Sequence, residues 1–324
     1  MPKIGDLNRE KIDVAIQSYK KPESLIYTLF SLKKYCGKHI DTIWINDDCS
    51  GGNALGLYRD LRLQEALAPI KLKVRENSKP SGYNITLMTK DAFFRHTFIQ
   101  RLQLLGYLPL RRLSFHSTSN DVRYQWAINN TDKKYLFIIH DDIKFFADIL
   151  GIYIDDIQSD SNLAIVGDLG YERLCPFGPC GKNCSPEKIL RGDFPCPTWP
   201  VTGYRSLLHR LLGRMRRDCR INEWCCLIDV SIAHKIYEKF GVFFGNYEAG
   251  GDVATYWLDR AMELGYSFDD PVPTPPKRLK YYLHWWQGYE GHEIWVNYGR
   301  GKQMYQKQQI RDLVENEFGY RITQ

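Results

Sequence analysis

The chain has 324 residues, of which 44% are hydrophobic and 25% charged, a composition typical of a globular protein with a full core and not of a disordered or fibrous one. The formal net charge of +6 is mild, so it suits an anionic ligand or membrane surface without requiring nucleic acid as a partner. The first ten residues are polar and no run of about eighteen apolar residues occurs, so we expect a cytoplasmic protein without signal peptide or membrane span.

The amino-terminal part is predicted to form a strand, a helix and a second strand. Residues 12–16 (IDVAI) and 42–45 (TIWI) are short apolar runs typical of buried strands. Between them Pro22 begins a helix, and Gly37 is placed to end it. Such a unit gives a parallel sheet through a right-handed crossover, and ligands bind at the carboxyl ends of its strands. The loops after these two strands are therefore the first places to expect a site.

Three further apolar runs predict strands, at residues 135–139, 163–166 and 224–228. The first of these is uninterrupted, as in a central parallel strand. A helix is expected to begin at Asp252 and to end near Leu264. Residues 53–115 and 171–222 fit none of these elements, so we expect them to be insertions.

Two pairs of adjacent aspartates, Asp47-Asp48 and Asp141-Asp142, follow predicted strands. Paired carboxylates at the end of a buried strand are costly unless positive charge balances them. Mg²⁺ and Mn²⁺ bind oxygen ligands and bridge carboxylates to diphosphate oxygens, which gives Asp141 and Asp142 a chemical purpose. The alternative is that one of them caps a helix starting at Ile143. The presence of two pairs favours ligand binding, with one pair at the base or ribose and the other at a metal.

Residues 12–52 resemble the amino-terminal nucleotide-binding half of family 2 glycosyltransferases of the GT-A fold. Both have a strand, a polar turn, a Pro-Glu-Ser-Leu helix start and a strand ending in Asp-Asp-x-Ser. Residues 135–143 (YLFIIHDDI) match the family's Asp-x-Asp position, with His140 in place of the first aspartate; its role stays open. Residues 224–245 and 248–266 resemble the acceptor half, in which a Gly-Gly-Glu-Asp-like turn opens a helix.

The resemblance implies an α/β fold of the GT-A type, with a mostly parallel central sheet flanked by helices and with insertions. A single transferase domain would cover residues 1–270, with the nucleotide-binding half at about 1–142 and the acceptor half at about 143–270. Residues 271–324 would be a C-terminal extension that packs on the active site.

The resemblance also implies roles for single residues. Asp252 would be the general base that takes the proton of the acceptor hydroxyl, with Glu248 in reserve because the family's Glu-Asp pair is here Gly-Asp; a helix cap is the alternative for Asp252. Asp142 would bind Mn²⁺ or Mg²⁺, and a late histidine, His284 or else His292, would complete the metal shell unless it is only a packed side chain. The nucleotide sugar would be bound by Ser18, Tyr19, Asp47, Asp48, Arg123 and Asp141.

The implied reaction moves a sugar from a nucleoside diphosphate to a hydroxyl of a glycan or lipid-linked saccharide in surface polysaccharide synthesis. Because a single base assists the attack, the configuration of the anomeric carbon would be inverted.

One alternative is a non-catalytic nucleotide-sugar-binding or zinc-bearing interaction protein, favoured by His140 and by the glycine before Asp252. A sugar nucleotidyltransferase is the other, but it needs a glycine-rich loop where residues 17–21 contain none.

Two features lie outside the resemblance. Residues 204–220 form a basic amphipathic pattern that predicts either a helix on the inner face of an anionic membrane or an ordinary docked helix. Four cysteines in a stretch rich in Pro and Gly could bind a structural Zn²⁺, with free thiols as the alternative: Cys175, Cys180, Cys184 and Cys196.

Overall fold

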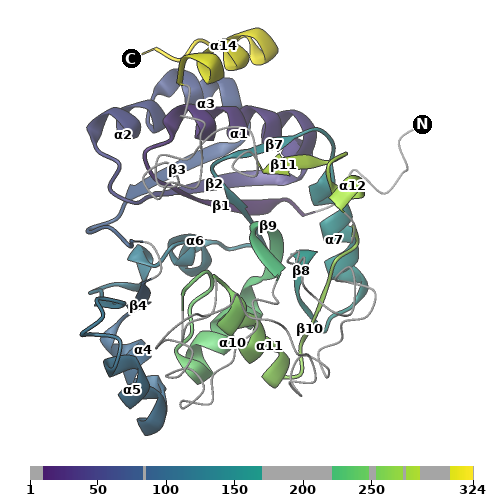
Figure 1. Cartoon of the computed structure of the whole chain (residues 1–324). Helices are drawn as coiled ribbons and strands as arrows, with labels where there is room; N and C mark the ends of the chain where they lie inside the picture. Colours follow the sequence, from purple (N-terminus) through teal and green to yellow (C-terminus); the bar gives the residue numbers. More distant parts are fainter. Residues whose placement is uncertain are drawn as a thin grey trace.

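The computed structural model describes residues 10–82, 85–169, 221–247, 253–272, 275–284 and 307–323. They form an α/β fold in which a seven-stranded sheet has helices on both faces (Figure 1). The strand order is β10-β8-β9-β6-β1-β2-β3. The strands are β1 (Ile12–Ser18), β2 (Ile40–Asp47), β3 (Lys71–Glu76), β6 (Tyr135–His140), β8 (Leu163–Leu169), β9 (Ile221–Asp229) and β10 (Ser267–Asp269).

The sheet is mostly parallel, because among its paired strands only β9 runs antiparallel to its neighbours, β6 and β8. The predicted α/β class with a mostly parallel central sheet is therefore confirmed. Helix α1 (Pro22–Cys36) connects β1 to β2 as the sequence predicts, and Gly37 follows its last residue. Lys21 holds the N-cap position of α1, where its ammonium group, a donor without an acceptor atom, makes no capping bond.

Side chains of the central strands alternate between two hydrophobic cores. Val14 and Ile16 of β1 point into the core beneath α1 and α7 (Ile149–Ser159). Ala15, between them, belongs to the core beneath α6 (Gln125–Asn130), α10 (Val230–Phe240) and α11 (Thr255–Glu263). The period of two is that of a strand buried on both faces, and it fixes the face of the sheet on which each side chain lies.

Residues 53–115, which the sequence left unassigned, supply part of the central sheet. Helices α2 (Gly52–Tyr58) and α3 (Leu61–Leu67) precede β3, which pairs with β2 at the edge of the sheet. The following residues form a separate small unit around β4 (Thr86–Met88), α4 (Lys90–Arg95), α5 (Phe98–Leu105) and β5 (Leu113–Phe115), with a hydrophobic cluster of its own.

The structure corrects two helix boundaries. Ile143 begins a strand, β7 (Ile143–Phe145), so the alternative that Asp141 or Asp142 caps a helix there is wrong; the next helix, α7, begins six residues later and is capped by Asp148. Helix α11 begins at Thr255 rather than at Asp252, because Ala254 at its N-cap has a left-handed conformation (φ 64°) that ends the preceding turn.

The chain beyond residue 270 returns to the amino-terminal half. After α12 (Pro275–Arg278), β11 (Tyr282–His284) pairs antiparallel with β7. Arg278 fixes this return through ion pairs to Asp168 and Asp270, at 2.5 and 2.6 Å. Helix α14 (Lys307–Phe318) packs on α1 (Figure 1). Within the described ranges, no helix is long and apolar enough to cross a membrane.

Asp148 stabilises the start of α7, and its replacement tests that contribution. Its carboxylate accepts the Gly151 backbone N–H and pairs with His39 and Lys38, at 2.9, 2.9 and 3.1 Å. Burial alone would raise the pKa of Asp148, but these partners lower it to about 2. We expect Asp148→Ala to reduce the free energy of unfolding by about 2 kcal/mol at neutral pH, measured by urea denaturation.

Because the folded-state pKa of Asp148 is depressed, its contribution is complete above the unfolded pKa of about 4 and is lost as the pH falls toward about 2. The difference between variant and wild type should shrink over that interval. The exposed Asp132 offers a control, since Asp132→Ala should change stability by less than about 0.5 kcal/mol. A constant difference from neutral pH to about pH 2 would contradict the assignment.

Candidate metal and nucleotide site

The carboxyl ends of β1, β2 and β6 meet at one edge of the sheet. The register pairs Ser18 with Asp47 and Gln17 with His140, so the residues after these strands lie close together. This is the edge at which ligands bind in parallel α/β sheets. It carries most of the sequence-predicted site residues that the structure describes.

Three possible metal ligands gather there from two separate parts of the chain. His140 ends β6, Asp142 follows it by two residues, and His284 ends β11. His284 Nε2 lies 2.9 Å from Asp142 Oδ1 and 3.2 Å from His140 Nδ1, and the last atom lies 4.0 Å from Asp142 Oδ1. The three ligand atoms all lie within 4.8 Å of one another. We call these residues the His-Asp-His cluster.

The spacing of the His-Asp-His cluster suits one divalent cation. Ligands about 2.1 Å from an octahedral ion lie about 3 Å from one another, close to the distances between these atoms. Asp142 and His284 are buried, whereas His140 is half-buried, so the cluster keeps a side toward solvent. Two imidazoles and one carboxylate favour Mn²⁺ over Mg²⁺, because Mg²⁺ prefers oxygen ligands.

Two side chains of β9, Glu223 and Trp224, lie beside the two histidines. Glu223 Oε1 lies 3.4 Å from His140 Nε2, the ring nitrogen that faces away from the cluster, and the Trp224 ring lies 5.0 Å from that of His284. A carboxylate on the outer nitrogen orients a ligating histidine and increases its basicity. Burial lowers the pKa of His284 to about 4, against the effect of Asp142, so the imidazole is neutral at physiological pH, the form that binds metals.

Lys21 is a site residue that the sequence analysis did not identify. Its ammonium group lies 2.6 Å from Asp141 Oδ1 and 2.7 Å from Asp142 Oδ2, with all three side chains buried. Burial alone would lower the pKa of Lys21, but the two carboxylates raise it. Burial alone would likewise raise the pKa of Asp142, but Lys21 and His284 hold it well below its usual range. Asp142 is therefore an anion, whereas burial raises the pKa of its neighbour Asp141 against the effect of Lys21.

Ser18 and Tyr19 lie beside the aspartate pair. The Tyr19 backbone N–H donates to Asp141 Oδ2 at 3.3 Å, and the Ser18 side chain also bonds to Asp141. The Ser18 hydroxyl lies 2.9 Å from that of Tyr58 on α2. The structure thus brings Ser18, Tyr19 and Asp141 together next to the His-Asp-His cluster.

Asp47 and Asp48 hold the loops that follow β2 and β3. Asp47 accepts hydrogen bonds from the backbone N–H and the hydroxyl of Ser50, at 2.8 and 2.6 Å. Asp48 accepts bonds from the Asn77 amide and from the backbone and hydroxyl of Ser81, at 2.7 to 2.8 Å. Both predicted nucleotide-binding residues therefore also shape the edge at which a nucleotide would lie.

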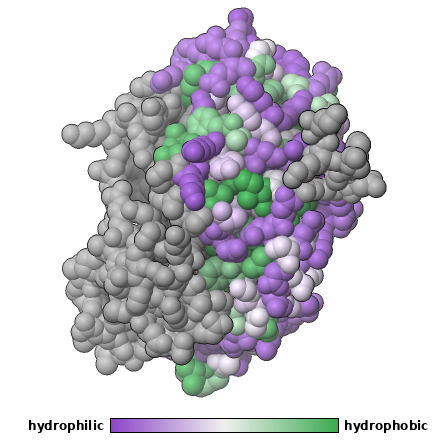
Figure 2. Space-filling model, turned by 90° about the vertical axis from the view of Figure 1, so that its right-hand side faces the viewer, coloured by the Kyte–Doolittle hydropathy of each residue, from purple (hydrophilic) through white to green (hydrophobic). Residues whose placement is uncertain are grey.

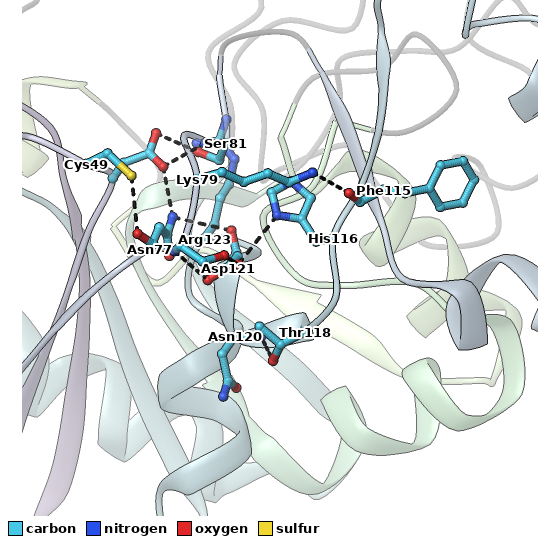
Figure 3. A network of polar contacts seen from close by, with 12 residues as sticks. Cys49, Asn77, Lys79, Ser81, Phe115, His116, Thr118, Asn120, Asp121 and Arg123 are labelled. Carbon is cyan, nitrogen blue, oxygen red and sulfur yellow. Dashed lines mark hydrogen bonds and ion pairs between the residues drawn. The ribbon is translucent and has the colours of Figure 1, made fainter.

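A buried polar network continues from Asp48 to the start of α6 (Figure 3). Asp121 is fully buried and accepts bonds from Arg75 Nη2 at 2.6 Å and from the Ser78 hydroxyl. His116 lies against it, with Nδ1 3.7 Å from Asp121 Oδ2, and burial and the nearby Lys79 lower the pKa of His116. No sequence motif indicated this network, because its members come from four separate segments.

Arg123 lies at the same edge. Its Nη1 donates to Gln17 Oε1 at 3.3 Å, and its guanidinium lies 4.9 Å from the centre of the Tyr247 ring. Its backbone is left-handed (φ 41°), as are those of Lys20 (φ 55°) and Cys49 (φ 62°) in the loops after β1 and β2. Non-glycine residues held in this conformation are strained, and such strain concentrates at functional sites.

The predicted bases Glu248 and Asp252 lie outside the described residues, as do His292, the four cysteines of the predicted zinc site and the predicted helix at 204–220. Both flanks of the base segment are described. Before it, the Tyr247 carbonyl accepts a hydrogen bond from the Thr86 hydroxyl. After it, Val253 and Ala254 are buried.

Lys21 should be required for stability in the absence of metal. Lys21→Met leaves two buried carboxylates without their cation, and we expect it to lower the free energy of unfolding by about 3 kcal/mol. Saturating Mn²⁺ should restore more stability to this variant than to wild type, since the ion supplies the missing positive charge. Thermal unfolding with and without Mn²⁺ measures both effects.

The control for Lys21→Met is Lys20→Met at the exposed neighbouring position, which should change stability by less than about 0.5 kcal/mol. Equal stabilities for the two variants would show that Lys21 does not balance the aspartate pair.

Comparisons with known proteins give distant structural matches only. No family model matches the chain, and no curated protein matches its sequence. Among solved structures, it is similar to the mannosyltransferase PcManGT from Pyrobaculum calidifontis in complex with GDP-Man and Mn²⁺, at 11% identity over 85% of this chain and 60% of that one, with a TM-score of 0.46.

Two other structures are similar at the same level. TarS from S. aureus has 11% identity over 84% of this chain and 59% of its own, with a TM-score of 0.45. Core-mannan synthase A from Aspergillus fumigatus, in its Mn/GDP form, has 12% identity over 87% of this chain and 77% of its own, with a TM-score of 0.43. The chain thus spans about three fifths of the length of the first two proteins. The likeness to these three structures is one of overall chain fold.

Proposed function

We propose that the chain is a metal-dependent glycosyltransferase that moves a sugar from a nucleoside diphosphate to an acceptor hydroxyl with inversion of the anomeric carbon. The observation that supports this most is the His-Asp-His cluster beside Asp141, at the sheet edge where the loops after β1 and β2 converge. A metal site next to a nucleotide-binding edge is what the departure of a nucleoside diphosphate requires.

The charges of the cluster fit this chemistry. His140, Asp142 and His284 would hold Mn²⁺ or Mg²⁺, which when bound neutralises the charge that develops on the leaving diphosphate. Lys21 pairs with both adjacent carboxylates and His284 is neutral, so Asp142 is the anion that would bind the cation. Glu223 would keep His140 in the orientation that presents Nδ1 to the ion.

The donor would lie along the edge from Asp141 to Asp48. Ser18, Tyr19, Asp47 and Asp48 would contact the nucleotide, because they line the loops that end β1 and β2. Arg123 is the cation of this group, and it is held at the edge by Gln17 and Tyr247, so it could reach the diphosphate or the sugar.

On the acceptor side, Asp252 would take the proton of the attacking hydroxyl, with Glu248 in reserve. A single base acting on the face opposite the leaving group gives inversion. The acceptor would be a hydroxyl of a glycan or lipid-linked saccharide in surface polysaccharide synthesis. The enzyme would then work at the inner face of a membrane, in agreement with the basic pattern at 204–220.

A non-catalytic nucleotide-sugar-binding protein is the second candidate. One observation favours it: the ammonium of Lys21 already bridges Asp141 and Asp142, so the aspartate pair has a cation without any metal. In that case Mn²⁺ should neither bind tightly nor be needed to bind the nucleotide.

Nucleotide release separates the two functions. Purified protein is incubated with UDP-, GDP- and dTDP-sugars, with Mn²⁺, with Mg²⁺ or with a chelator, and the free nucleoside diphosphate is measured. Slow hydrolysis of one donor that needs the metal supports the transferase even before the acceptor is known. Donor binding in calorimetry that is unchanged by the chelator, without release of nucleotide, would contradict it.

A further inference from the structure

The hairpin of α4 and α5 carries hydrophobic side chains on its outer surface. Phe94, Phe98 and Ile99 are each 67% exposed, and Leu102 is 53% exposed. Of the eleven large hydrophobic side chains that are exposed among the described residues, seven lie between residues 94 and 110. We call them the outer face of the hairpin: Phe94, Phe98, Ile99, Leu102, Leu105, Leu108 and Leu110.

The outer face reverses the usual pattern of a surface helix. Phe98, Leu102 and Leu105 follow one another at spacings of four and three, so they share one side of α5, and that side faces outward. On the inner side only Leu104 of α5 is buried, in the cluster with Leu87 and Leu113. A helix whose more apolar side faces solvent has a partner for that side.

The helix does not depend on the outer face for its own formation. Thr97 and Gln100 form a capping box at its start, in which the Thr97 hydroxyl accepts the Gln100 N–H and the Gln100 side chain accepts the Thr97 N–H. The inner contacts of the hairpin lie in its own small core, which includes Ala92 and Phe243. The exposed side chains are therefore available to bind a partner without unfolding the hairpin.

Basic residues surround the outer face. Residues 90–112 contain five Lys and Arg side chains and a single acidic one, Asp91, which is paired with Arg95 at 3.0 Å. Arg101 lies beside the outer face, 5.7 Å from the centre of the Phe94 ring. Arg111 is exposed at the end of the hairpin. An apolar face with a basic rim fits a partner that has an apolar interior and an anionic surface.

We propose that the outer face of the α4–α5 hairpin docks on an anionic lipid bilayer. The phenylalanine and aliphatic side chains enter the layer below the headgroups, and the arginines around them contact the phosphates. A second copy of the chain is a poorer partner, because apposing two outer faces would bring their basic rims together.

The position of the hairpin suits this role. Figure 1 shows α4 and α5 at the outer edge of the molecule, far from α3 and α14. On the face seen in Figure 2, which lies at the right of Figure 1, hydrophilic side chains are spread between the hydrophobic ones. Strand β4, which leads into the hairpin, is joined to the segment before Glu248, since the Asn246 side chain bonds to the backbone N–H and carbonyl of Leu87, at 3.0 and 2.8 Å. Docking would thus hold the predicted acceptor side at the bilayer.

Co-sedimentation with vesicles tests the docking surface, and it needs no turnover. The full chain is mixed with vesicles of phosphatidylcholine alone or of phosphatidylcholine and phosphatidylglycerol in a two-to-one ratio. We expect binding to the anionic vesicles that weakens with added salt. The triple variant F98S/I99S/L102S should bind roughly tenfold more weakly, and R101Q/R111Q/R112Q should lose the preference for phosphatidylglycerol.

The matched control is Leu61→Ser, which removes a side chain that is 71% exposed on α3, and it should bind as wild type does. Thermal unfolding checks that each variant is folded. A further test loses no apolar residue: the Phe98→Trp variant should show a larger shift of tryptophan fluorescence than wild type when vesicles are added.

Three results would overturn the proposal. The first is wild-type protein that does not bind the anionic vesicles. In the second, the triple variant binds as strongly as wild type, which would indicate docking through another part of the chain, such as the basic sequence at 204–220. In the third, the outer face drives self-association of the chain while vesicle binding is absent. Because none of these readouts depends on transferase activity, they are distinct from a failure of the proposed function.

Discussion

Asp142→Asn should lower the rate of sugar transfer by about 10²–10³-fold and weaken Mn²⁺ binding strongly. Asp142 is the only anionic member of the His-Asp-His cluster, and Lys21 and His284 keep its pKa well below the usual range, so it presents a charged oxygen at neutral pH. Asparagine keeps the shape but offers a neutral oxygen and an N–H₂ group that would repel a cation. Nucleotide release at saturating donor and calorimetric titration with Mn²⁺ measure the two effects.

Asp270→Asn is the control for a lost buried carboxylate. Asp270 is buried and paired with Arg278 at 2.6 Å, much as Asp142 is paired with Lys21, but it does not belong to the His-Asp-His cluster. This variant should be less stable yet keep its Mn²⁺ affinity. If Asp142→Asn binds Mn²⁺ as wild type does, or retains more than about a tenth of the activity, the metal is not held by Asp142.

Asp252→Asn is expected to slow transfer by about 10²–10⁴-fold while leaving donor affinity and Mn²⁺ affinity within about twofold of wild type. The expected effect is on kcat, because the base acts on the acceptor hydroxyl in the transition state. The structure fixes both flanks of this segment: Tyr247 contacts Arg123 and Thr86 on one side, and Val253 and Ala254 are buried on the other.

Glu248→Gln distinguishes the two candidate bases. If Asp252 is the base, Glu248→Gln keeps most of the activity, and the reverse result would transfer the role to Glu248. NMR of the product gives the anomeric configuration at the same time. A product that retains the configuration of the donor would exclude a single displacement assisted by either carboxylate.

Much of the fold can be predicted from the sequence because its central strands are apolar on both faces. The strands at 12–16, 42–45 and 135–139 and the helix from Pro22 all appear in the structure. Strand β3 could not be found in this way: its sequence KLKVRE alternates charged and apolar side chains, because it lies at the sheet edge with one face half-exposed. The antiparallel direction of β9 also cannot be predicted from the sequence of the strand itself, since it depends on how the chain returns to the sheet.

The site was predictable only where its residues follow strands. Ser18, Asp47 and Asp142 could be placed at one edge, because the carboxyl ends of parallel strands converge. Lys21 gave no signal in sequence, since a lysine in a polar turn before a helix is usually exposed; its role depends on burial against carboxylates 120 residues away. His140 was recognised as a departure from the family pattern, but only its 3.2 Å distance to His284 makes it a possible ligand.

The pairing of β11 with β7 affects the order in which the site can assemble during synthesis. His284 is 142 residues from Asp142 in sequence, so the ribosome translates all seven sheet strands before it reaches the third ligand. A nascent chain that ends between residues 269 and 275 contains all seven sheet strands but lacks both β11 and the Arg278 ion pairs that fix its approach. The growing chain would acquire the nucleotide-binding edge first and the complete ligand set only after β11 has been synthesised.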